Sequence, residues 1–108
     1  MSKFYIVAKL SREFLRGMMQ KPDQNRAELT KAMVEKVGLT FHSVEFVRGD
    51  YDMVGIVEGE YENVLGMKVA VMQTGMMDEM ILLDCSFDIN KTASNAALAA
   101  SNYTKTTD

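Results

Sequence analysis

Strand-like and helix-like hydrophobic patterns alternate along the first half of the chain. Residues 4–10 place apolar side chains at every second position and predict a strand. Residues 12–20 and 26–37 carry apolar side chains at helical spacing. We expect these two pieces to form one amphipathic helix that is kinked or broken near Pro22, because proline cannot donate a backbone hydrogen bond.

Capping residues bound the two helical pieces. Ser11 precedes the first piece, and its hydroxyl can accept a hydrogen bond from a backbone amide of the first turn. Asp23 is expected to cap the second piece in the same way. Gly38 is expected to end it, because glycine tolerates the left-handed conformation that often follows a helix.

Two strands and a tight turn follow. Residues 39–48 and 51–58 predict neighbouring antiparallel strands. Gly49 and Asp50 lie between them, and glycine at the first central position is typical of a two-residue type II′ turn, which requires a positive φ there. We therefore expect a β-hairpin.

The last two predicted elements are a helix over residues 60–73 and a strand over residues 80–89. The core-facing side of the helix is expected to contain Tyr61, Val64, Leu65, Lys68, Val69 and Met72. One face of the strand is expected to contain Ile81, Leu83, Cys85, Phe87 and Ile89. Cys85 is accordingly expected to be a small buried hydrophobic residue and not a nucleophile.

The order strand, helix, strand, strand, helix, strand is that of the ferredoxin-like βαββαβ fold. This is an α+β fold in which two helices cover one face of a four-stranded antiparallel sheet. A chain of 108 residues has room for one such domain, which we place at residues 1–89. Residues 90–108 form a polar, alanine-rich tail, with a short helix expected over residues 96–100 before the end frays.

The sheet face away from the helices is expected to be apolar. In residues 41–47 and 53–57, which we expect in central strands, apolar side chains point to both sides. An exposed apolar sheet of that size marks an association surface, and a twofold homodimer is the commonest way to bury it. We therefore expect a homodimer or a higher even oligomer with sheets packed face to face.

Composition narrows the partners and the compartment. The net charge of -3 and the pI near 5.1 provide no strong positive field, so nucleic acid is not expected as a partner. No apolar run approaches the roughly 20 residues that a membrane-spanning helix needs, so no membrane association is expected. A single cysteine and the lack of an export signal favour the cytoplasm.

Few residues are candidates for chemistry. His42 is the only histidine, and it could act as a general base, as a metal or haem ligand, or as an ordinary strand residue. Tyr51 and Asp52 follow the predicted turn, where they could contact a ligand or simply hold the turn. No metal or cofactor is expected, because one His and one Cys fall short of the four ligands of a structural zinc site.

Other polar residues interrupt apolar strands. Tyr5, Glu45 and Arg48 would orient a ligand if they faced a cavity, and would be merely solvated at strand ends. The chain also has ten methionines, several of them close to the fourth predicted strand. A Cu(I) site is one interpretation, but flexible filling of the core and interface is the better one.

Residues 48–58 read Arg-Gly-Asp-Tyr-Asp-Met-Val-Gly-Ile-Val-Glu. This segment resembles the Gly-x-Tyr-Asp signature and the following strand of GYD-domain proteins. Residues 4–7 resemble the opening strand of that family, and residues 26–28 and 34–38 resemble its first-helix pattern. The resemblance extends over roughly residues 4–89 and implies a dimeric α+β barrel, in which two ferredoxin-like units join their sheets around a cavity.

The resemblance and the apolar face lead to one functional hypothesis and one alternative. We expect a homo-oligomeric module that binds a small organic ligand in a cavity between sheets. The residues expected at this site are Tyr5, His42, Glu45, Arg48, Tyr51 and Asp52. The alternative is a cofactor-independent monooxygenase-like or isomerase-like enzyme, as in other dimeric α+β barrels, with His42 as the proton-transfer group.

Overall fold

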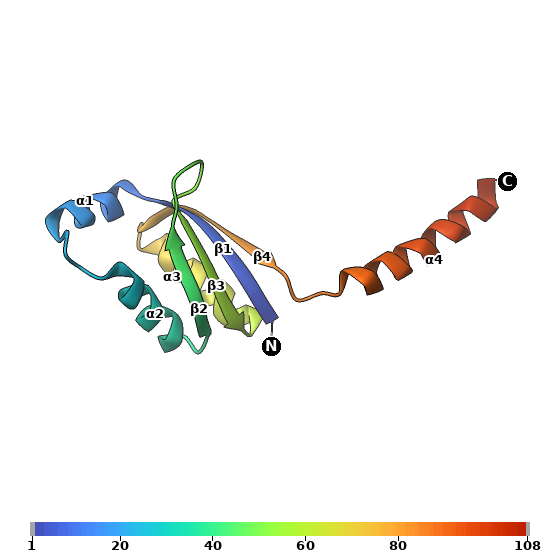
Figure 1. Cartoon of the computed structure of the whole chain (residues 1–108), viewed down its shortest axis with the longest axis horizontal. Helices are drawn as coiled ribbons and strands as arrows, with labels where there is room; N and C mark the ends of the chain where they lie inside the picture. Colours follow the sequence, from blue (N-terminus) through green and yellow to red (C-terminus); the bar gives the residue numbers. More distant parts are fainter. Residues whose placement is uncertain (1, 108) are drawn as a thin grey trace.

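A four-stranded antiparallel sheet forms the centre of the computed structural model, which describes the backbone of residues 2–107 and the side chains of residues 2–102 (Figure 1). The strands are β1 (Ser2–Leu10), β2 (Thr40–Phe46), β3 (Met53–Gly59) and β4 (Met77–Asp84). They are hydrogen-bonded in the order β2-β3-β1-β4, so β1 and β3 are central. This is the predicted ferredoxin-like arrangement, with β2 at an edge of the sheet and not at its centre.

The helices before the last strand are α1 (Arg12–Gln20), α2 (Arg26–Lys36) and α3 (Tyr61–Gln73). α2 and α3 cover one face of the sheet, and α1 lies beside them (Figure 1). The last helix, α4 (Ile89–Thr107), projects away from the sheet and is longer than the short helix predicted for the tail. Among the described residues, no helix combines the length and the apolarity needed to cross a membrane.

The predicted kinked helix is two separate helices. Ser11 caps α1 as expected, because its hydroxyl accepts a hydrogen bond from a first-turn amide at 3.1 Å. Asn25, and not Asp23, caps α2 in the same way. Asp23 lies inside a turn that the Gln24 amide closes by donating to the Lys21 carbonyl, so it comes too early to reach the first turn of α2.

The hydrophobic core lies between the sheet and the helices. β1 contributes the predicted alternate positions Phe4, Ile6, Ala8 and Leu10. The other buried hydrophobic residues are Val34, Leu39, Met53, Val57, Val64, Met67, Val71, Met77 and Met80. Because side chains alternate along a strand, the intervening residues of β1 and β3 point to a second face that no helix covers.

The prediction for the fourth strand is wrong in extent and in phase. β4 ends before Cys85, and it pairs with β1 so that Leu82 lies opposite Ile6. Residues opposite each other in an antiparallel pair point to the same face, so Leu82 packs against the core. Leu83, which was expected inside, is 51% exposed. Also exposed, against the prediction, are Cys85, Phe87 and Ile89.

The hairpin loop is wider than the predicted two-residue turn. The Val47 amide donates to the Asp52 carbonyl at 2.8 Å, which leaves residues 48–51 in the loop. Asp52 is also bound to β1. Its amide donates to the Ala8 carbonyl, and its Oδ2 accepts a hydrogen bond from the Leu10 amide, both at 2.9 Å. This long-range attachment fixes where the loop ends.

Helix α3 turns a different side to the core than predicted. Val64, Met67 and Val71 are buried, whereas Val69 is 61% exposed. Apolar residues occur on both sides of this helix, so periodicity alone does not choose between them. Packing against the sheet selects the side.

Val64 and Val69 allow a matched test of this orientation. Val64→Ala removes two buried methyl groups and should lower the free energy of unfolding by about 2 kcal/mol. Val69→Ala should change it by less than about 0.5 kcal/mol, as surface substitutions usually do. Urea unfolding followed by circular dichroism measures both values, and a larger loss in Val69→Ala would contradict the orientation.

Candidate functional site

A pocket of about 310 Å³ lies between the sheet and the helices that cover it. Its lining is almost entirely apolar. Seven of the ten methionines of the chain line it, namely Met18, Met33, Met53, Met67, Met76, Met77 and Met80. Because the methionine side chain is flexible and polarizable, such a lining can adapt to apolar molecules of different shapes.

The pocket exists because the helix layer is divided. α2 packs mainly on β2 and α3 mainly on β4, so the middle of the sheet is covered less closely. There Gly55 of β3 lines the pocket without a side chain to fill it. Phe14 and Met18 of α1 also line the space, together with Val57 of β3.

Few polar groups line the pocket, and most of them are already hydrogen-bonded. The hydroxyls of Thr30 and Thr74 donate to carbonyls of their own helices, both at 2.8 Å. The Arg26 guanidinium donates to the carbonyls of Gly17, Lys21 and Gln24, which ties the end of α1 to the start of α2. Arg26 forms no ion pair with a described residue, so its charge is not neutralised there.

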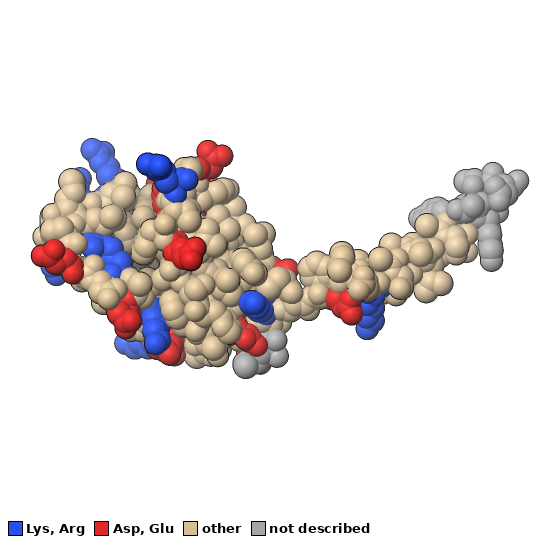
Figure 2. All heavy atoms as spheres, in the orientation of Figure 1, with Lys and Arg blue, Asp and Glu red and all other residues tan. Residues whose placement is uncertain are grey.

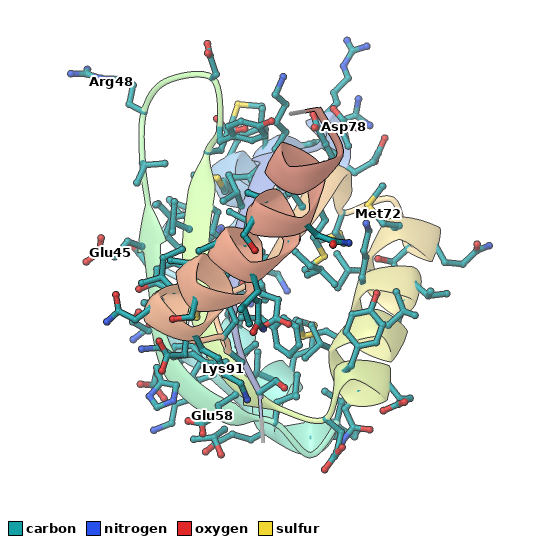
Figure 3. All side chains as sticks on the ribbon, turned by 90° about the vertical axis from the view of Figure 1, so that its right-hand side faces the viewer. Glu45, Arg48, Glu58, Met72, Asp78 and Lys91 are labelled. Carbon is teal, nitrogen blue, oxygen red and sulfur yellow. The ribbon has the colours of Figure 1, made fainter. Side chains whose placement is uncertain are left out.

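None of the six residues predicted for the site lines this pocket. Tyr5 and Glu45 lie on the sheet face that no helix covers, and Figure 3 shows Glu45 pointing away from the helices. His42 reaches the edge of the same face, where its ring contacts Glu58. Arg48 extends from the hairpin loop toward solvent (Figure 3). In the single chain these residues therefore do not form one cluster.

His42 has one close polar partner, at the edge of this uncovered face. Its Nε2 lies 2.9 Å from Glu58 Oε1, where the β2–β3 register shifts between Phe41 and Ser43. A carboxylate can orient an imidazole for proton transfer. Neither residue lines the pocket, so the proton-transfer role of His42 stays a prediction.

Tyr51 and Asp52 hold the loop end of the sheet together. The Tyr51 hydroxyl donates to Glu79 at 3.3 Å, and Lys9 Nζ lies 5.4 Å from the Tyr51 ring centroid. Lys9 also forms an ion pair of 3.8 Å with Glu79. Together with the bond from Asp52 to the Leu10 amide, these contacts perform the turn-holding role that was one of the two interpretations of this pair.

The pocket on the helix side was not predicted from the sequence. Two signals were present: a glycine, Gly55, in the middle of a predicted strand, and the excess of methionines. The methionines do fill the core as expected, but they also line the space that remains. Among the described residues, no group of three or more His, Cys, Asp and Glu side chains could hold a metal ion.

Comparison with protein-family models matches residues 4–90 to the GYD domain. The chain belongs to the GYD-domain family. The match extends from β1 to the first residues of α4, so the GYD domain contains both the pocket and the uncovered sheet face. Its Gly-x-Tyr-Asp motif forms the end of the hairpin loop that Asp52 fastens to β1. No curated protein and no solved structure matches the chain.

The fastening role of Asp52 in this GYD domain is open to a direct test. Asp52→Ala leaves the part-buried Leu10 amide without its acceptor and should lower the free energy of unfolding by about 1–3 kcal/mol. Asp50→Ala, at the exposed tip of the loop, should change it by less than about 0.5 kcal/mol. Urea denaturation of both variants measures the difference, and equal losses would exclude the role.

Proposed function

We propose that this GYD domain binds a small, largely apolar organic molecule in the pocket between its sheet and helices, and that it works as a homo-oligomer. The observation that carries the proposal is the pocket of about 310 Å³ with its methionine-rich lining. Sites for small organic molecules have volumes from about 300 Å³ upward and apolar linings with few polar groups. The pocket has both properties.

The polar groups of the pocket narrow the class of ligand. The hydroxyls of Thr30 and Thr74 already donate to backbone carbonyls. Gln24, Ser43 and Arg26 are the other polar residues of the lining. A sugar or another polyol would therefore find few partners and would bury most of its hydroxyl groups without one, at a cost of about 1–3 kcal/mol for each group. Arg26 is the one cationic side chain of the lining. It favours a ligand with an apolar body and a single carbonyl or acidic group.

Helix α1 supports this assignment. It has a strongly apolar side, yet none of its residues is fully buried, and Leu15 and Met18 are 49% and 37% exposed. Met18 and Phe14 line the pocket. A bound apolar molecule would remove more of the Met18 and Phe14 side chains from water.

The pocket is not the cavity that the sequence predicted. That cavity lies between the sheets of two copies, with Tyr5, His42 and Arg48 as orienting residues, and it remains a prediction that requires a second chain. The two sites are on opposite faces of the sheet, so ligand binding in the single chain does not depend on the cavity between copies.

The face of the sheet that no helix covers, hereafter the open face, supports the proposed self-association. The register of the strands brings six apolar residues into two adjacent rows, Val54–Val7–Ile81 and Ile56–Tyr5–Leu83. Figure 2 shows this face with few charged side chains over its middle. A contiguous apolar surface of this kind is typical of an interface, and a second copy of the chain would remove it from water.

Two glycines on helices provide a matched test of the pocket. Gly17 lines the pocket and Gly66 does not, and a Cβ added at either position would meet no atom within 4 Å. We expect the neutral dye N-phenyl-1-naphthylamine to bind with increased fluorescence. Gly17→Phe should fill the space and weaken binding about tenfold or more, equivalent to about 1.4 kcal/mol.

The control Gly66→Phe should bind the dye as the original chain does. Native mass spectrometry of freshly purified protein would in addition reveal a co-purified molecule that Gly17→Phe loses. Equal dye binding by both variants would show that the dye occupies another place and would remove the support for this pocket.

A charge on the open face tests self-association. Val54→Glu places a carboxylate at the β3 end of one apolar row and should shift an oligomer to the monomer, because a buried unpaired charge is costly. Val69→Glu, on the exposed side of α3, should leave association unchanged. Sedimentation velocity over a concentration series measures both, and an intact oligomer in folded Val54→Glu would exclude this face.

A further inference from the structure

Helix α4 lacks the surroundings that would keep it folded. It is 19 residues long and projects from the domain (Figure 1). Ile89 is 65% exposed. Isolated helices of this length are marginal in water, and tertiary packing supplies most helix stability in proteins. Among its described side chains only Lys91 is charged, which is unusual for a helix surrounded by water.

The connection between β4 and α4 is fixed by hydrogen bonds. The Cys85 amide and the Ser86 hydroxyl donate to the Lys3 carbonyl, at 3.1 and 3.1 Å. Asp88 caps the helix, because its Oδ1 accepts hydrogen bonds from two first-turn amides. The connection therefore leaves the domain from a point held beside β1, and α4 projects away from its own sheet (Figure 1).

The open face has the size and the chemistry to receive such a helix. At 1.5 Å per residue α4 is about 28 Å long, and strands of seven to nine residues are about 23–30 Å long. The two apolar rows lie on β3, β1 and β4, whereas β2 contributes the polar residues Ser43 and Glu45 beside them. A nearly uncharged helix on this surface would bury no unpaired ion.

We propose that α4 of one copy lies across the open face of a second copy, and that the exchange is reciprocal. The side of α4 that contains Ile89, Ala93 and Ala96 would face the sheet, because these residues share one helical stripe and the small alanine side chains permit close approach. The inference rests on the self-association proposed above and names the element that provides it.

Buried area favours a reciprocal exchange over a one-way contact. A helix about 28 Å long and about 10 Å wide covers about 280 Å². One arm on one sheet then buries about 560 Å² in total, counting both surfaces, whereas two arms bury about 1,100 Å². A specific interface needs about 1,000 Å² or more. Only the reciprocal arrangement, a twofold dimer, reaches this value.

Paired substitutions on opposite sides of α4 test the proposal in the full chain. Ala93→Glu combined with Ala96→Glu places two carboxylates on the side that contacts the sheet, and should raise the dissociation constant of the dimer at least about tenfold. The matched control, Ser94→Glu combined with Ser101→Glu, places the same charges on the opposite side and should leave it nearly unchanged. Sedimentation velocity gives both constants.

Cross-linking between two chains identifies what α4 touches. In a Cys85→Ser background, a tagged chain with Ala96→Cys is mixed with an untagged chain with Tyr5→Cys and treated with a short bismaleimide. A product that joins the two chains supports the exchange. A chain that carries both Tyr5→Cys and Ala96→Cys tests the opposite arrangement. If this double variant cross-links only within one chain, α4 is folded over its own sheet and the exchange is overturned.

The remaining outcomes separate this inference from the proposed function. One outcome is that Val54→Glu dissociates the oligomer and the double variant Ala93→Glu, Ala96→Glu does not. In that case the open face associates with another sheet, and the proposed exchange of α4 is wrong. If the original chain is a monomer at all concentrations, both the exchange and the proposed self-association fail. The dye test of the pocket is unaffected by either result.

Discussion

The pairing of β1 on both of its sides decides the two surfaces of this protein. Alternate residues of β1, such as Ile6, enter the core, and those between them, such as Tyr5, point to the open face. Pairing in register imposes the same division on the neighbours, because Ile6 lies opposite Gly55 of β3 and Leu82 of β4. A slip of one residue in either ladder would exchange the two faces of that strand. The positions of the pocket and of the apolar rows both follow from this register.

The helix layer covers the sheet incompletely, and the pocket is the result. The interruption at Pro22 divides one potential helix into α1 and α2, which Arg26 joins again through backbone carbonyls. α2 and α3 then lie over opposite parts of the sheet. Protein interiors are normally close-packed, so space left above Gly55 needs adaptable side chains around it, and methionine is the most adaptable of the apolar residues.

Local signals in the sequence predicted most elements of this fold but not how they meet. Ser11 as a cap and the alternation of β1 depend on neighbouring residues only, and both predictions are confirmed. The predictions of which residues of β4 and α3 face the core were wrong, because each element is apolar on both sides. Packing against the rest of the domain decides which side is buried. The hairpin itself is confirmed, but its two-residue turn was wrong, because the length of the loop depends on the bond between Asp52 and distant β1. The pocket is lined by residues of all four strands and of α1, α2 and α3, and no single stretch of sequence contains it.

The two proposed binding events use opposite faces of the same strands. On β3, Gly55 lines the pocket, while Val54 and Ile56 on either side of it belong to the open face. Side-chain substitutions can therefore affect one event without touching the other. β1 and β3 are hydrogen-bonded on both sides, so they cannot shift without breaking a ladder, and they separate the two events more than they connect them. The edge strand β4 differs, because it lines the pocket through Met80, meets the open face through Ile81 and leads into α4. An effect of ligand binding in the pocket on the association of a second copy would therefore be transmitted most directly by β4.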